Sequence, residues 1–352
     1  MSIINEHLRF LKKKLSKKSH IDKFVDKAIL LNTHSRKVIV FPETDTKILK
    51  ACSIILKQGI AVPLIIGERA EVQALLHKLG IHNVKDQHIL DHLEDKNRFQ
   101  LETYAKEFYE MRKADGKDMT LDEARDLMTK SHYYGAMLVQ KGVADGMISG
   151  MHSQTKPYYP AFQIVKTRPG IPRASGLMIM QREEEIYFFS DIALNQNPSV
   201  DELAGVALTT AETALNLGIE PRIAMLSFST HGSSKHELVD KVRNATEIVR
   251  TKSPELVLDG EIQFDAAILP EVAQKKCHDS PLQGKANTFI FPDLNAGNIG
   301  YKIASIFGGF RAVGPIMQGL NKPINDVSHG STEDEIVELT AITVIQSTWK
   351  SR

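Results

Sequence analysis

Three segments of this sequence gather hydroxyl side chains just after predicted strands, at residues 153–155, 229–234 and 328–332. Hydroxyls and backbone N–H groups near the start of a helix are donors suited to a phosphate or an acyl phosphate. One such loop is usually an ordinary turn. Three of them favour a shared anionic ligand, with the following candidate residues: Ser153, Lys156, Ser229, Thr230 and Ser233.

The third loop carries the densest set of reactive groups. Residues 325–335 read Asn-Asp-Val-Ser-His-Gly-Ser-Thr-Glu-Asp-Glu and then enter an apolar periodic segment. Ser331 or Thr332 is expected to cap a helix there, with Asp334 and Glu335 in its first turn. Hydroxyl, imidazole and carboxylate groups around Gly330 predict a site-building loop.

Several other chemistries lack their motifs. There is no Walker loop, no GxGxxG after a strand, no CxxC, no HExxH and no nucleophile elbow. The 13 histidines show no metal-ligand spacing. We therefore expect neither a bound metal nor a tightly bound cofactor.

Composition is that of a soluble globular protein. The chain has 352 residues, 42% hydrophobic and 25% charged, with a formal net charge of +1 that gives no general attraction for nucleic acid. Its 2 cysteines are far apart in sequence, which favours a reducing compartment. No apolar run reaches the length of a membrane span. A cytoplasmic enzyme with no nucleic-acid or membrane partner is the expectation.

Alternating strand and helix patterns position these loops. Residues 37–42 form a β-branched run, a helical period follows over 46–57, and the pattern repeats over 61–67 and 68–79. This alternation predicts a parallel sheet with helices on both faces. Residues that follow the first two strands therefore fall on the edge where ligands of such sheets bind: Glu43, Thr44, Asp45 and Gly67.

The rest of the chain continues in the same way. Residues 94–141 are mostly helical, with a capping box at Thr120 and Glu123, and a strand ends at Gly150. A hairpin over 175–190, a helix over 200–216 and further strands predict a second α/β unit. The expected organisation is 1–168 plus 315–352 for the first domain and 169–314 for the second.

The N-terminus carries a local excess of positive charge. Leu8, Leu11 and Leu15 recur at helical spacing beneath a basic face, which predicts a helix within residues 1–20. A solvated helix packed on the body is favoured over a membrane-surface or targeting helix.

Five long motifs resemble the phosphate acetyltransferase (phosphotransacetylase) family over about residues 37–347. They lie at residues 219–230, 258–267, 284–287, 291–302 and 314–326. The resemblance implies two three-layer α/β domains, as in isocitrate and isopropylmalate dehydrogenases, with a cleft that binds coenzyme A, an acyl phosphate and phosphate. It also implies a homodimer.

The resemblance further implies roles for individual residues. Ser328 matches the serine that hydrogen-bonds the developing charge, and Glu335, or its neighbour Asp334, takes the place of the carboxylate that deprotonates the thiol. Arg112 matches an arginine that holds phosphate. The motifs also place three amides among the expected substrate-binding residues: Asn295, Asn298 and Asn325.

Several positions depart from the family pattern. His329 and Tyr159 stand where arginines are expected, Glu335 replaces an aspartate, and Thr44 and Lys47 differ near the N-terminus. Neutral His and Tyr lack the permanent, forked charge of Arg. Two hypotheses follow: an acyltransferase acting on coenzyme A and an acyl phosphate, or a weakened or inactive paralogue that binds acyl-coenzyme A as a sensor or regulatory subunit.

Overall fold

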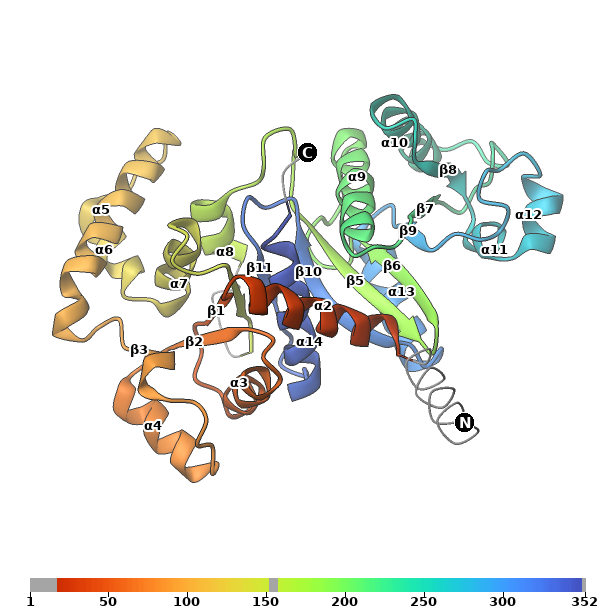
Figure 1. The fold of residues 1–352 in the computed structure, drawn as a ribbon. Helices are drawn as coiled ribbons and strands as arrows, with labels where there is room; N and C mark the ends of the chain where they lie inside the picture. Colours follow the sequence, from red (N-terminus) through yellow and green to blue (C-terminus); the bar gives the residue numbers. More distant parts are fainter. Residues whose placement is uncertain (1–17, 152–157, 350–352) are drawn as a thin grey trace, which may run out of the picture.

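The computed structural model describes residues 18–151 and 158–349, so most of the basic N-terminal helix expected at 1–20 lies outside it. Within these residues the strands form two sheets, each covered by helices (Figure 1). The predicted two-domain α/β architecture is confirmed.

The first sheet is parallel, with the strand order β11-β4-β1-β2-β3. Its strands are β1 (Val38–Phe41), β2 (Val62–Ile66), β3 (Ile89–Leu90), β4 (Gly146–Ser149) and β11 (Ile324–Asp326). The chain runs from β1 outward to β2 and β3, and then places β4 and β11 on the opposite side. The order therefore reverses between β1 and β4, and the carboxyl ends of strands at such a reversal are where α/β sheets generally bind their ligands.

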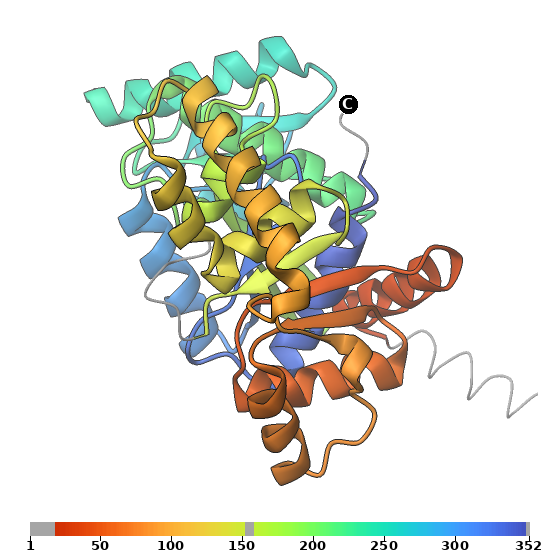
Figure 2. The same ribbon diagram turned by 90° about the vertical axis from the view of Figure 1, so that its left-hand side faces the viewer.

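Alternate residues of β1 separate two helical layers. Ile39 and Phe41 join a core with α2, α3, α4 and α14, whereas Val40 joins a core with α5, α6 and α7. Figure 2 shows the α5–α7 side from the front. The helices are α2 (His20–His34), α3 (Thr46–Gln58), α4 (Arg69–Lys78), α5 (Arg98–Ala114), α6 (Leu121–Met128), α7 (Ser131–Gln140), α8 (Tyr158–Pro160) and α14 (Glu333–Gln346), with a π-helical turn at Ala161–Val165.

The second sheet is mixed, with the order β10-β5-β6-β9-β7-β8. Strand β5 is antiparallel to both β10 and β6, and the remaining pairs are parallel. The strands are β5 (Ser175–Arg182), β6 (Glu185–Ser190), β7 (Arg222–Leu226), β8 (Val257–Ile262), β9 (Thr288–Ile290) and β10 (Arg311–Gln318). The predicted hairpin over 175–190 is thus confirmed.

Helices cover both faces of this sheet as well. Ile223, Met225 and Ile290 pack against α9 (Val200–Asn216) and α10 (Glu237–Lys252). Ala224, Phe289 and their neighbours pack against α11 (Phe264–Ile268), α12 (Pro270–Lys276) and α13 (Leu294–Ile306). The second domain therefore also has three layers.

Helices α2 and α14 lie between the two sheets (Figure 1). In α14 every residue from Ile336 to Gln346 is buried, as expected of a helix surrounded by protein. Helix α2 packs along α14 and reaches the second domain, where the N–H of Ile21 donates to Oε1 of Gln181 at 3.0 Å. One hydrophobic core thus joins the domains.

Two segments cross between the domains, and they pair with each other. Thr167 and Leu320 form an antiparallel bridge, and the N–H of Arg168 donates to the carbonyl of Gly319 at 2.8 Å. The expected boundary at residue 314 falls inside β10, which belongs wholly to the second sheet. The return crossing therefore follows Gln318.

Candidate active site

A buried carboxylate, Glu43, follows β1 at the carboxyl edge of the first sheet. Its Oε2 accepts hydrogen bonds from the N–H groups of Gly150 at 3.0 Å and Met151 at 2.9 Å, just after β4. Its Oε1 lies 3.3 Å from Nε2 of His132 at the start of α7. Glu43 thus ties three segments together at the expected binding edge.

Gly150 permits a close approach between the β4 turn and the end of β11. Its φ is +122°, and a Cβ there would lie 1.9 Å from Oδ1 of Asp326. The N–H of Val327 donates to the carbonyl of Ser149 at 2.8 Å. The turn at 150–151 and the Ser328 loop are therefore held side by side.

Ser328 lies exposed in the loop between β11 and α14. Its N–H donates to Oγ of Ser331 at 3.1 Å, and the two Oγ atoms are 3.3 Å apart. Lys47 of α3 donates from Nζ to the carbonyls of Ser331 at 2.9 Å and His329 at 3.4 Å. The hydroxyl of Ser328 is thus exposed to solvent, and hydrogen bonds from Lys47 hold the loop that carries it.

The first turn of α14 places its acidic residues beside this loop. Thr332 is the N-cap, as one of the two predicted alternatives, and forms a capping box with Glu335, whose Oε2 accepts the Thr332 N–H at 2.9 Å. Oε1 of Glu335 takes no part in that bond. Asp334 and His329 are exposed. The structure therefore brings Ser328, His329, Asp334 and Glu335 into one segment.

Arg112 and Tyr159 meet at a second cluster, around the phenol of Tyr133. Burial raises the pKa of Tyr133, with the Arg112 charge opposing and Tyr159 adding to that rise. The Arg112 side chain is 16% exposed, and its Nε has no hydrogen-bond partner within the described chain. The predicted residues Ser153 and Lys156 lie outside the described residues.

The hydroxyl loop after β7 is turned inward. Ser229 is fully buried and donates to Oε1 of Glu261 at 3.1 Å, while the N–H of Gly232 donates to the same oxygen at 2.7 Å. Thr230 donates its N–H to Oγ of Ser233 at 3.1 Å. The loop therefore surrounds the carboxylate of Glu261. The contacts of these hydroxyls do not support the predicted role in binding an anionic ligand.

Arg243 completes that arrangement, with Nε 3.0 Å from Oε2 of Glu261. Burial acts to raise the pKa of Glu261, but the hydrogen bonds from Arg243 and from the Gly232 N–H outweigh it and hold the pKa below its usual value. Glu261 is therefore the resident anion of this loop.

The three predicted asparagines have different surroundings. Asn325 is fully buried, with Nδ2 donating to Thr343 and Gln346 and Oδ1 accepting the N–H of Met317 at 2.8 Å. Its contacts are structural, because they join β11 to α14 and β10. Asn298 donates to the carbonyl of Ile192 at 3.0 Å, and Asn295 is exposed; both lie on α13.

A cleft of about 450 Å³ opens between the domains. Phe162, Lys166 and Thr167 line it from the first domain and its crossing, and Leu194 and Asn195 from the second. None of these residues is among those predicted from the sequence. Two cations, Lys166 and Arg173, line the cleft.

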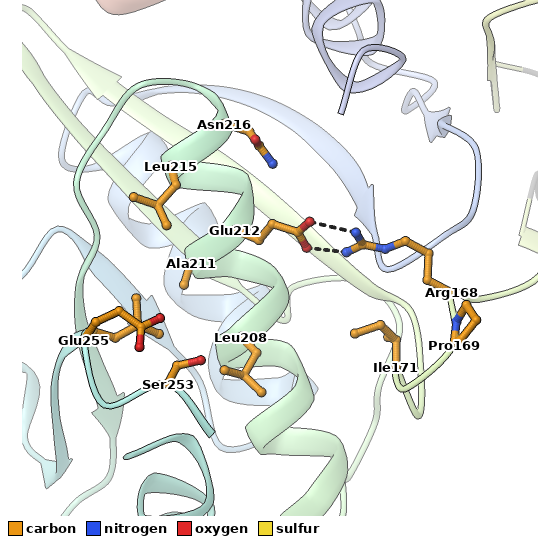
Figure 3. A pocket seen from close by; sticks show the side chains of 11 residues that line it. Arg168, Pro169, Ile171, Leu208, Ala211, Glu212, Leu215, Asn216, Ser253 and Glu255 are labelled. Atoms are coloured by element: carbon orange, nitrogen blue, oxygen red, sulfur yellow. Dashed lines mark hydrogen bonds and ion pairs between the residues drawn. The ribbon is translucent and has the colours of Figure 1, made fainter. Parts of the chain in front are cut away.

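A further cavity, of about 410 Å³, lies against α9 (Figure 3). Much of its apolar wall is formed by Leu208, Ala211 and Leu215. At its rim the guanidinium of Arg168 hydrogen-bonds to the carboxylate of Glu212. This ion pair attaches the segment that crosses between the domains to α9. None of the predicted site residues lines the cavity.

Known proteins resemble the chain along nearly its whole length. The family model described as phosphate acetyl/butaryl transferase matches residues 23–344. The chain belongs to the phosphate acetyl/butaryl transferase family. A phosphate acetyltransferase of Bacillus subtilis (strain 168) is 46% identical over 315 residues, covering 88% of this chain and 94% of that protein.

Solved structures agree with this membership of the transferase family. A phosphotransacetylase from Streptococcus pyogenes is 45% identical with a TM-score of 0.85, covering 93% of this chain and 98% of that one. A 4-hydroxythreonine-4-phosphate dehydrogenase from Klebsiella pneumoniae, 14% identical with a TM-score of 0.50 and covering 88% and 98% of the two chains, shares the fold alone. The predicted dehydrogenase-like fold class is confirmed.

Among residues 18–151 and 158–349, no group of three or more His, Cys, Asp or Glu residues could hold a metal ion. Over the same residues, no helix has the length and apolar character needed to cross a membrane.

Proposed function

We propose that this protein interconverts acetyl-coenzyme A and phosphate with acetyl phosphate and coenzyme A. The observation that carries the proposal is family membership across both domains, including the segment that presents Ser328 at the carboxyl edge of the first sheet. Coenzyme A is a substrate in this proposal, and no tightly bound cofactor is needed.

The reaction needs a thiolate, because a free thiol with a pKa of about 8.5 is mostly protonated at neutral pH. We assign Glu335 as the base that accepts the thiol proton, on Oε1, the oxygen that takes no part in the capping bond. Asp334, which is exposed, is the alternative base. The thiolate then attacks the carbonyl carbon of acetyl phosphate. As the tetrahedral intermediate collapses, the C–O bond to phosphate breaks, the thioester forms and phosphate leaves.

We assign to Ser328 the hydrogen bond that stabilises the negative charge developing on the carbonyl oxygen. Its support is its exposed hydroxyl on a loop whose backbone is held by Ser331 and Lys47. A donor fixed in advance is worth far more in a transition state than one that must reorganise.

The phosphate needs a permanent charge, and we assign Arg112 to it. Support comes from its largely buried guanidinium, whose Nε has no partner in the described chain. His329 and Tyr159 offer hydrogen bonds but no permanent charge at the two positions where the family carries arginine. We therefore expect weaker phosphate binding than in relatives that keep those arginines.

A coupled assay of acetyl phosphate and coenzyme A tests the function. We expect acetyl-coenzyme A to form with the purified protein and the rate to collapse in Ser328→Ala. Calorimetric titration with acetyl-coenzyme A should be run beside it. Binding without turnover of acetyl, propionyl or butyryl phosphate would overturn the enzyme and leave the acyl-coenzyme A sensor.

We also propose that the protein is a homodimer. Helix α13 and its C-cap carry an apolar stripe of Ile299, Ile303, Ile306 and Phe307, which are 56%, 53%, 75% and 87% exposed. Monomers rarely expose large apolar patches. Light scattering should give twice the mass of the chain, and Ile306→Lys should reduce it to one; a monomeric wild type would refute the proposal.

A cytoplasmic location is proposed on similar grounds. Both cysteines, Cys52 and Cys277, are free and buried. Free thiols are typical of a reducing compartment. Fractionation of cells that express the protein, with soluble cytoplasmic and membrane markers, tests this location.

A further inference from the structure

We propose that the short segment from Glu43 to Lys47, where the chain passes from β1 into α3, fixes the two halves of the active site relative to each other, with Glu43 and Lys47 as its positioning residues. The inference rests on the proposed function. Glu43 holds the turn after β4, and Lys47, four residues later, holds the loop that carries Ser328. One short segment, residues 43–47, therefore contacts both of these segments.

Glu43 fixes the first half through backbone donors. Its side chain is 7% exposed, so its charge is supported by protein groups rather than by water. The N–H groups of Gly150 and Met151 supply two charge-assisted hydrogen bonds, which are stronger than neutral ones. The position of the turn at 150–151 is therefore set by this carboxylate.

Lys47 fixes the second half through backbone acceptors. Asp45 caps α3 and accepts the N–H of Lys47 at 2.7 Å, which sets where the lysine side chain starts. Nζ then reaches the carbonyls on both sides of Gly330. Ser328 is thus held from within its loop by Ser331 and from outside by Lys47.

The two attachments are mechanically linked. Ser149 pairs with Asp326, and the Val327 N–H bonds to Ser149 at 2.8 Å, so movement of either segment is passed to the other. A misplacement of about 1 Å in a catalytic group can lower a rate roughly a hundredfold. The contacts of Glu43 and Lys47 described above are to protein, which makes them positioning rather than catalytic residues.

Each variant has a matched control in the same domain. Lys47→Met is paired with Lys50→Met, because Lys50 lies one turn further along α3 and bonds the Glu333 side chain of α14 at 3.4 Å instead of the loop backbone. Glu43→Gln is paired with Asp145→Asn, because Asp145 accepts the N–H of Val38 at 2.9 Å at the opposite end of β1.

We expect kcat to fall about 10- to 100-fold in Lys47→Met and Glu43→Gln, with KM for coenzyme A changed less than about threefold. Lys47→Arg, which keeps donors within reach of the carbonyls, should restore most of kcat. The two controls should stay within about twofold of wild type when assayed well below their unfolding temperatures.

Hydrogen exchange on the substrate-free protein gives a readout that does not need turnover. The amides of Gly150 and Met151 should exchange at least about tenfold faster in Glu43→Gln, and those of residues 328–331 in Lys47→Met, than in the matched controls. Unchanged exchange, or equal losses of kcat in variants and controls, would overturn the inference. Absence of turnover in the wild type would instead overturn the proposed function, while the exchange data would still decide the positioning role.

Discussion

The carboxyl ends of the two sheets carry loops of similar composition, and a buried glutamate accepts backbone N–H groups in each. In the second domain Glu261 also accepts the hydroxyl of Ser229, so that loop is closed on itself. In the first domain Glu43 accepts the N–H groups of the neighbouring turn and lies 3.3 Å from His132, and Ser328 remains exposed. The two loops therefore differ in what their hydroxyls do. The Ser328 loop has its glutamate beside it and keeps a hydroxyl exposed, so it is a candidate site. The Ser229 loop encloses its glutamate and uses its hydroxyls for structure.

The largest expected effect tests the open loop. Ser328→Ala should lower kcat about 10²- to 10³-fold, because one oxyanion donor typically contributes that much. Steady-state kinetics and the urea midpoint should be measured together, and the midpoint should not move. A rate within a few-fold of wild type would remove Ser328 from the chemistry and erase the contrast between the loops.

Glu261→Gln tests the closed loop. The amide cannot accept from Ser229, Gly232 and Arg243 as a carboxylate does, so the free energy of unfolding should fall by about 2 kcal/mol. Urea unfolding measures this, with Asp240→Asn as a control, since Asp240 bonds the same Arg243 at 3.0 Å but is 57% exposed.

The effect of Glu261→Gln should also depend on pH. The pKa of Glu261 is lowered from 4.5 in the folded protein, so its contribution is present above that pH and is lost as the pH falls through the lowered value. The variant and wild type should therefore converge in acid. A difference that persists there would contradict the role of the charge.

Glu338 can be compared with Glu43 and Glu261, because it is a third buried carboxyl group and is paired with Arg311. Burial raises its pKa to about 7, although the Arg311 charge opposes the rise. Its favourable contribution is complete below the unfolded pKa of 4.5 and is lost as pH rises toward 7. Glu338→Gln should thus be more stable than wild type at pH 8, by up to about 3 kcal/mol, and nearly equal to it near pH 4.5.

Thermal unfolding across that pH range provides the measurement. Arg311 is 47% exposed and can be solvated without Glu338, so its loss of a partner is expected to cost little. A variant less stable than wild type at pH 8 would show that the ion pair outweighs burial.

The smallest effect is expected for Ser229→Ala. This change removes the hydroxyl bonds to Glu261 and to the N–H of Ser234, each 3.1 Å long, and should cost about 1 kcal/mol of unfolding free energy. Turnover by the folded variant should remain within about twofold of wild type. A loss of turnover comparable to that of Ser328→Ala would place the second loop in the active site.

Most helices and strands could be predicted because their signals are local. The apolar period of α3, the Thr120–Glu123 capping box and the β5–β6 hairpin all occur as the sequence indicates. The boundary at 314 was misplaced because Gly314 and Pro315 are typical of a linker. In the structure they occupy a break in the β10–β5 register between Val313 and Ile316, where a strand tolerates proline.

The site could be predicted only in part, because the direction of a polar side chain depends on distant contacts. Asn325 contacts Met317 of β10 and Thr343 of α14, which lie 8 and 18 residues away in the sequence. The glycines near Asn295 resemble a ligand-binding turn but lie inside α13, where a Cβ on Gly297 would come within 2.0 Å of the Asp191 carbonyl. Glu43 could be placed on the correct edge by its position after β1, but its partners could not be predicted.

The position of β11 and α14 in the first domain has a consequence for biosynthesis. The second sheet is built from residues 175–318 without interruption, whereas the first lacks an edge strand and its most buried helix until residues 324–346 have been made. Although domains generally fold in the order of their synthesis, here the later domain is the first to have its complete chain. The nascent protein therefore exposes the apolar face that α14 covers until residues 324–346 have been made, and Ser328 reaches its place only when that segment docks.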